Sequence, residues 1–96
     1  MNNQDRFVEW YMRQINPHTQ QPYKESGARV YLTYIRSLVR NHLVPSQIFD
    51  CNAADFIRLT NMARERDPIR FESLNNHDNL KRGIYWYARF LRECGA

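Results

Sequence analysis

Residues 78–94 read DNLKRGIYWYARFLREC, and this stretch decides the fold class. Apolar side chains recur in it every three or four positions, which is the spacing of one face of an α-helix. That face consists of Leu80, Ile84, Tyr87 and Leu91, with Phe90 and Cys94 beside it. Gly95 follows as a suitable C-cap residue. The stretch therefore predicts a long amphipathic helix with one buried face.

Three earlier segments show the same periodicity. They run from about Gln4 to Ile15, from near Ser26 to Val44-Pro45, and from about Asn52 to Arg66, and each ends close to a proline, which disfavours the α conformation before it. Asn52 is a good N-cap, and Asp55 in the first turn suits the helix dipole. The predicted inward-facing residues are Phe7, Val8, Tyr11 and Ile15; Ala28, Tyr31, Leu32, Ile35, Leu38, Val39, His42 and Leu43; and Phe56, Leu59, Thr60 and Ala63.

The whole chain is predicted to be one all-α domain. A length of 96 residues suits one domain and is too short for two. The chain has 3 Gly and 4 Pro and no sustained strand alternation, so a β architecture is disfavoured. Two short apolar pieces, Ile48-Phe49 and Ile69–Phe71, are expected to plug the bundle or form a turn of helix. We therefore expect residues 1–96 to form a compact bundle of four main helices.

The charge of the chain is basic and is carried by arginine. The net charge is +4, and all of the 14 cationic residues except Lys24 and Lys81 are arginines. The planar guanidinium suits phosphate and carboxylate groups better than the ammonium of lysine does. An arginine-rich basic domain is therefore a candidate for binding polyanions.

The basic residues concentrate on two of the four predicted helices. In the second helix, Arg29, Thr33, Arg36 and Arg40 lie on the face away from the apolar one, and no acid occurs between Glu25 and Asp50. In the fourth helix, the corresponding residues are Lys81, Arg82, Tyr85, Arg89 and Arg92. The first and third helices alternate acids and bases, as solvated faces do. The asymmetry favours a nucleic-acid interface in which cations neutralise phosphates and Tyr85 and Thr33 add groove contacts.

Several short motifs occur in a characteristic order. The aromatic-rich segment Phe7–Tyr11 is followed by a Thr-x-x-x-Tyr element from Thr19 to Tyr23, a long helix, an acid-bearing helix that starts at residues 52–56, and an aromatic-rich last helix over residues 80–91. This order, over most of the chain, resembles the N-terminal core-binding domain of the tyrosine recombinases, the phage-integrase group with a SAM-like helical fold. Helical domains that precede restriction-type nucleases are similar through the stretches Ala28–Arg36 and Tyr87–Leu91.

The recombinase resemblance implies DNA binding without catalysis. In that family the second and fourth helices lie against the major groove, and the domain forms half of a clamp. The resemblance thus implies DNA contacts at Arg29, Thr33, Arg36, Arg40, Lys81, Tyr85, Arg89 and Arg92. The family's catalytic half requires a His-x-x-Arg motif, and no histidine of this chain is followed by arginine at that spacing.

Other chemistry has little support in the sequence. His18, His42, His77, Cys51 and Cys94 are scattered without the spacing of a metal site or a catalytic triad. We therefore expect no enzyme activity, no cofactor and no small-molecule substrate. The polar N-terminus is no signal peptide, and no apolar run is long enough to span a membrane. The expected location is the cytoplasm, with no membrane partner and both thiols reduced.

Two functions remain open. The first is a non-catalytic module that binds double-stranded DNA through the basic faces of the second and fourth helices. The alternative is a small inhibitor or adaptor, of phage or defence type, whose basic and aromatic surface binds an acidic protein. Its expected anchors are Trp10, Tyr34, Tyr85 and Trp86, since Trp, Tyr and Arg dominate binding hot spots. The Met1 start and the lack of a trailing linker are patterns that we expect of such a small protein.

Overall fold

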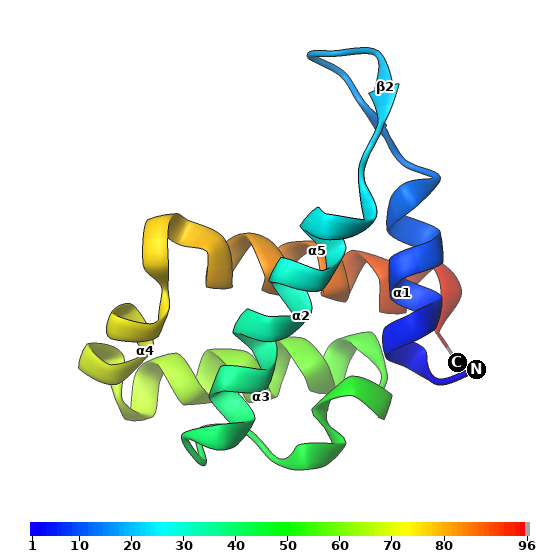
Figure 1. Cartoon of the computed structure of the whole chain (residues 1–96). Helices are drawn as coiled ribbons and strands as arrows, with labels where there is room; N and C mark the ends of the chain where they lie inside the picture. Colours follow the sequence, from blue (N-terminus) through cyan, green and yellow to red (C-terminus); the bar gives the residue numbers. More distant parts are fainter. Residues whose placement is uncertain (96) are drawn as a thin grey trace.

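The computed structural model describes residues 1–95, which form the predicted all-α fold (Figure 1). The helices are α1 (Asn3–Met12), α2 (Glu25–Arg40), α3 (Ala53–Arg66), α4 (Pro68–Leu74) and α5 (Asn79–Cys94). Two short 3-10 helices, η1 (Ser46–Asp50) and η2 (Asn76–Asp78), lie between them. Strands β1 (Ile15–Asn16) and β2 (Gln21–Pro22) pair antiparallel in a small hairpin. Helix α5 lies at the centre of the bundle and packs against α1, α2 and α3.

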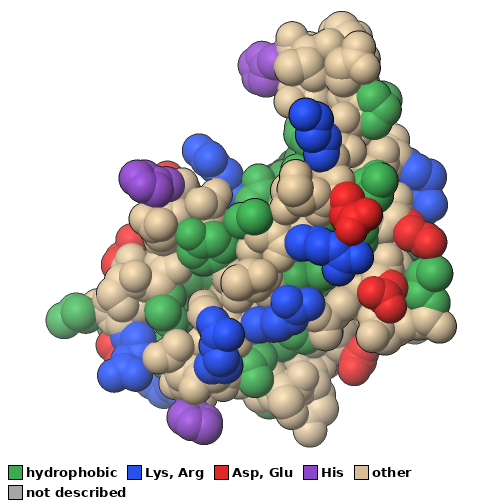
Figure 2. Space-filling view, viewed as in Figure 1, with side chains coloured by type: hydrophobic (Ala, Val, Ile, Leu, Met, Phe, Trp, Pro, Cys, Tyr) green, Lys and Arg blue, Asp and Glu red, His purple; other side chains and the backbone are tan. Residues whose placement is uncertain are grey.

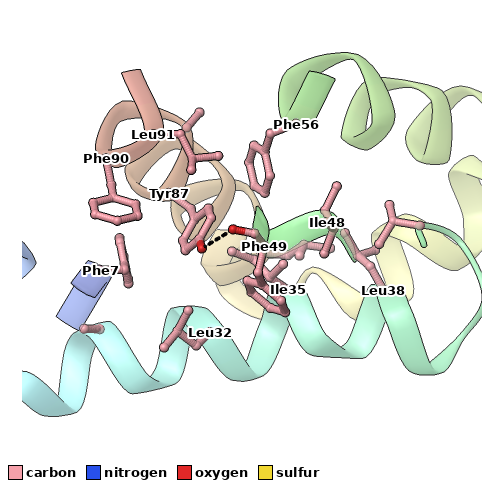
Figure 3. Packing of buried hydrophobic residues seen from close by; sticks show 14 of the residues in the cluster. Phe7, Leu32, Ile35, Leu38, Ile48, Phe49, Phe56, Tyr87, Phe90 and Leu91 are labelled. Carbon is pink, nitrogen blue, oxygen red and sulfur yellow. Dashed lines mark hydrogen bonds between the residues drawn. The ribbon is translucent and has the colours of Figure 1, made fainter. Parts of the chain in front are cut away.

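Aromatic rings fill the core between α1, α3, α5 and η1 (Figure 3). The ring centroid of Tyr87 on α5 lies 5.0 Å from that of Phe7 on α1 and 5.2 Å from that of Phe56 on α3. The Tyr87 hydroxyl donates a hydrogen bond of 2.8 Å to the backbone carbonyl of Phe49 in η1. These separations are favourable for aromatic pairs. The last helix therefore joins the first and third helices through one fully buried side chain, Tyr87.

Helices α2 and α5 approach closely at Gly83. A Cβ atom at that position would lie 3.1 Å from the Tyr31 Cβ and 3.2 Å from the Tyr31 carbonyl oxygen. Glycine therefore permits a helix crossing that a larger residue would force apart.

The ends of α3 and α5 have the caps that the sequence predicts. The Asn52 side chain accepts a hydrogen bond of 2.8 Å from the Asp55 backbone N–H, so Asn52 is confirmed as the N-cap. Gly95 is confirmed as the C-cap of α5, and its N–H donates to the Leu91 carbonyl at 2.8 Å. Each cap satisfies a backbone group that the helix itself leaves without a partner.

Helix α1 is shorter than predicted. It ends at Met12 with Arg13 as C-cap, and Ile15 pairs with Pro22 in the hairpin, where it is 54% exposed. The prediction that Ile15 extends the buried stripe is therefore wrong, whereas the rest of that stripe is buried. The Asn16-Pro17 pair favours extended backbone at this point, so the chain leaves the bundle instead of adding another helical turn.

The second predicted helix is also shorter, and His42 does not face inward. Helix α2 ends at Arg40, and His42 adopts a left-handed conformation with φ of 58°. The Leu43 N–H donates to the Leu38 carbonyl at 2.9 Å, which is the longer hydrogen bond of a Schellman motif. This motif ends the helix and leaves the His42 side chain exposed, while Leu43 remains buried. The inward orientation predicted for His42 is therefore wrong.

The two short apolar pieces have different roles. Ile48 and Phe49 in η1 are buried, as predicted for a plug of the bundle. Residues 69–71 lie in an additional helix, α4. In this helix Phe71 is buried but Ile69 is 84% exposed. Asp67 starts this helix, since its side chain accepts a hydrogen bond from the Arg70 N–H at 3.1 Å. The bundle therefore has one more helix than the four predicted.

Candidate nucleic-acid interface

One basic face lies on α2. Arg29, Thr33, Arg36 and Arg40 are all exposed, as the sequence predicts. Lys and Arg side chains form a row over α2 in the space-filling view, and acidic side chains flank the end of the row near α1 (Figure 2). Arg40 lies eleven residue steps after Arg29 along the helix, which is about 16 Å at 1.5 Å per step. The Thr33 hydroxyl donates to the Arg29 carbonyl at 2.9 Å and keeps its lone pairs for other contacts.

The three arginines of this face differ in their partners. Arg29 forms an ion pair of 2.6 Å with Glu25 on the same helix, and this hydrogen bond raises the pKa of the Arg29 guanidinium. Arg36 donates two hydrogen bonds, of 3.0 and 2.7 Å, to the neutral side-chain oxygen of Gln4 on α1. Within residues 1–95, Arg36 and Arg40 form no ion pair with an acid. Their positive charges are therefore open to an external anion.

A second basic face lies on α5, and its cations are more strongly engaged. Lys81 pairs with Glu72 at 3.4 Å. Arg89 pairs with Glu93 at 2.8 Å, and this hydrogen bond raises the pKa of Arg89. The Arg89 guanidinium also lies 5.2 Å from the ring centroid of Trp86, a cation–π distance. Tyr85 is 60% exposed on this face. The two remaining predicted residues, Arg82 and Arg92, are exposed and form no ion pair in the described part of the chain.

The two basic faces point in different directions. Tyr31 of α2 and Gly83 of α5 mark the contact between the helices. At about 100° per residue, every predicted DNA-binding residue on either helix lies roughly 100° or more around the helix from this contact. Consistently, Arg36 contacts α1, whereas Tyr85 and Lys81 line a recess of about 260 Å³ between α3, α4 and α5. The fold therefore does not bring the predicted site residues together on one surface.

Most of the predicted aromatic anchors belong to the core or its edge. Trp10 is 4% exposed, so its predicted role as a surface anchor is wrong. Trp86 is half-buried, and its ring lies 6.0 Å from Trp10 and 5.2 Å from Tyr23. Tyr34 is also half-buried. Of the four predicted anchors, Tyr85 alone is a largely exposed side chain.

A projecting hairpin is a second feature, besides α4, that the sequence did not predict. Residues 13–24 leave α1, turn through β1 and β2, and return at the start of α2, so that the loop extends well beyond the helices (Figure 1). Its two strands contain only two residues each, too few for a recognisable alternation. A nearby proline indicated the end of the first predicted helix, but not the extended shape of the segment that follows.

Cysteine and histidine residues form no common site. Cys51 is half-buried, its thiol donates to the Ile48 carbonyl at 3.1 Å, and burial raises the pKa of that thiol. His18, His42 and His77 are exposed on separate turns. Among residues 1–95, no group of three His, Cys, Asp or Glu side chains is arranged to hold a metal ion. Over the same residues, no helix combines the length and the hydropathy that a membrane span requires.

A shallow groove also lies at the C-terminal end of α2. Its volume is about 540 Å³, and Arg66 on one side donates to the His42 and Leu43 carbonyls at 3.0 and 2.9 Å. Its walls are mostly apolar, and Met62 is half exposed there. The ionisable residues that line the groove are His42 and Arg66, and no acid among residues 1–95 lines it.

Comparison with models of protein families, with curated proteins and with solved structures found no match to this chain.

Proposed function

We propose that this protein binds double-stranded DNA through the exposed face of α2. The observation that carries the proposal is the row of Arg29, Arg36 and Arg40, of which two have no acidic partner within residues 1–95. Cations in a row neutralise phosphates and release condensed counterions, which favours binding at low salt. The roughly 16 Å between Arg29 and Arg40 corresponds to about five base-pair steps along a strand.

The face of α2 supports this function better than the face of α5 does. On α5, contact with phosphate at Lys81 or Arg89 would compete with Glu72 or Glu93. On α2, within residues 1–95, only Arg29 has such a competitor, Glu25. Arg89 is also held against Trp86. Because the two faces point in different directions, a straight duplex that lies along α2 does not reach α5. The proposal therefore narrows the predicted interface to Arg29, Thr33, Arg36 and Arg40, with Lys24 at the start of the helix.

Fluorescence anisotropy with a labelled duplex of about 20 base pairs tests the proposal. The longest extent of the molecule is 38 Å, or about 11 base-pair steps, so such a duplex covers the whole surface. Each phosphate contact contributes about −0.9 to the slope of log K against log salt. Contacts from Lys24, Arg36 and Arg40, which pair with no acid within residues 1–95, give an expected slope of about −2.7.

A pair of double variants separates the α2 face from general positive charge. Arg36→Gln/Arg40→Gln should reduce the slope to about −0.9, because the Lys24 contact remains. Arg82→Gln/Arg92→Gln removes the same charge from α5 and should leave the slope near that of the unaltered chain. An equal loss in both variants contradicts the assignment to α2. Absence of duplex binding by the unaltered chain at low salt overturns the proposal and favours the acidic-protein alternative.

A further inference from the structure

The hairpin over residues 13–24 is fixed to the body of the molecule by aromatic packing. The Tyr23 ring stacks on that of Tyr11 with centroids 4.8 Å apart, and Trp86 meets Tyr23 edge-on at 5.2 Å. The Tyr23 N–H also donates to the Gln14 carbonyl at 3.1 Å. Tyr11 is itself 4% exposed, so the base of the hairpin is continuous with the core. The base of the hairpin is therefore packed against the core.

Some polar side chains of the hairpin form hydrogen bonds within its turn, and others form none. The Asn16 side chain accepts from the His18 N–H at 2.9 Å, and the Thr19 hydroxyl accepts from the Gln21 N–H at 3.3 Å. The Gln20 side chain donates to the Pro17 carbonyl at 3.0 Å. In contrast, the side chains of His18 and Gln21 are exposed and form no hydrogen bond within residues 1–95.

The segment is also free of negative charge. No acidic residue occurs between Glu9 and Glu25, whereas Arg13 and Lys24 place a cation at each side of the hairpin base. A projecting ribbon without acids can approach a polyanion without electrostatic repulsion. Because α2 starts at Glu25, directly after the hairpin, the hairpin projects from the end of α2 at which the row of arginines begins (Figure 1).

We propose that this hairpin is the base-reading element of the DNA interface, with His18 and Gln21 contacting base edges in the major groove; the inference rests on the proposed function. The major groove admits a two-stranded ribbon, and a glutamine amide can form two hydrogen bonds with adenine. Phosphate contacts from α2 set the position along the duplex but carry no sequence information. In this arrangement α2 supplies most of the affinity, and the hairpin supplies the sequence preference.

Selection from a random-sequence duplex library tests whether the hairpin supplies the sequence preference. The unaltered chain is expected to enrich a sequence motif, and His18→Ala/Gln21→Ala is expected to lose the motif. Preference for the enriched duplex over an unselected one should fall roughly 10- to 100-fold in this variant, the range expected for the loss of one or two base contacts. Binding to the unselected duplex, and its salt slope, should remain within about 2-fold of the unaltered chain.

A matched control removes the same kind of side chain from another exposed turn. Asn76→Ala/His77→Ala in η2 should keep both the motif and the affinity. Retention of the motif by His18→Ala/Gln21→Ala overturns this inference alone, as does the failure of the unaltered chain to enrich any motif while it binds duplex. If the unaltered chain binds no duplex, the proposed function fails and this inference fails with it.

Discussion

Replacement of Tyr87 by phenylalanine removes one buried hydroxyl and leaves the ring in place. That hydroxyl donates to the Phe49 carbonyl at 2.8 Å, in a residue with no exposed surface. The same carbonyl also accepts a hydrogen bond of 3.0 Å from the Asn3 side chain, so it keeps one partner in the variant. A net hydrogen bond contributes about 0.5–1.5 kcal/mol, and the larger cost of a bare buried carbonyl does not arise. We therefore expect Tyr87→Phe to lower the free energy of unfolding by about 1 kcal/mol at pH 7, or roughly 4–8 °C in Tm.

The loss should shrink and then reverse at high pH. Burial holds the pKa of Tyr87 well above its ordinary value, because the phenolate would lose its hydration. The unfolded chain releases this proton from about pH 10, whereas the folded chain keeps it, so the tyrosine destabilises the fold as pH rises past 10. At pH 11 this cost is about 1.4 kcal/mol, and phenylalanine avoids it. The stability curves of the two proteins should cross at about pH 10.7, where the ionisation cost equals the roughly 1 kcal/mol that the hydrogen bond contributes.

Urea unfolding followed by far-ultraviolet circular dichroism, at pH 7 and in steps to pH 11, measures both effects. Tyr85→Phe is the matched control, because Tyr85 is 60% exposed and should change stability by less than about 0.5 kcal/mol. A deficit of Tyr87→Phe that stays constant from pH 7 to pH 11 refutes the burial argument. No deficit at pH 7 refutes the contribution of the hydrogen bond.

Three further substitutions test the caps and the helix crossing. Asn52→Ala removes the N-cap of α3 and should cost about 1 kcal/mol in urea unfolding. Gly83→Val places a side chain against the Tyr31 backbone and should lower stability by about 2 kcal/mol, with a thermal melt as the measurement; an unchanged melt contradicts the close crossing. Asn75→Ala should cost about 1–2 kcal/mol, because the buried Asn75 side chain accepts from the Lys81 N–H at 3.0 Å, and faster amide exchange at Lys81 should accompany the loss.

Local periodicity predicted most of the fold. The stripe of Leu80, Tyr87 and Leu91 is buried, and the cap at Asn52 has the expected geometry, because both depend on residues within a few positions of each other. The misplaced residues lie at helix ends. Ile15 continues an apolar period but precedes Asn16-Pro17, and His42 is the left-handed residue of the Schellman motif that ends α2. Arg66, which donates to the His42 carbonyl, comes from a distant helix that the local pattern around His42 does not include.

For the candidate site too, local sequence patterns predict which residues are exposed but not how distant elements are arranged. That Arg36, Arg40 and Tyr85 are exposed follows from the helical period of each segment alone. The relative direction of the two basic faces depends on how α2 crosses α5, which Gly83 permits but does not specify in sequence. The hairpin escaped prediction because its strands are too short to alternate, and its position depends on the packing of Tyr23 against Tyr11 and Trp86.

The separation of faces on α2 has a consequence for how this protein can change over evolutionary time. None of Arg29, Thr33, Arg36 and Arg40 belongs to the buried core, whereas the inner residues of the same helix, such as Leu32 and Ile35, are 1% and 0% exposed. Substitutions on the outer face therefore alter surface charge with little effect on folding. On α5, in contrast, Arg89 also lies over Trp10 and Trp86, so a change there disturbs packing as well. Helix α2 is thus a surface on which charge can change while the fold is retained.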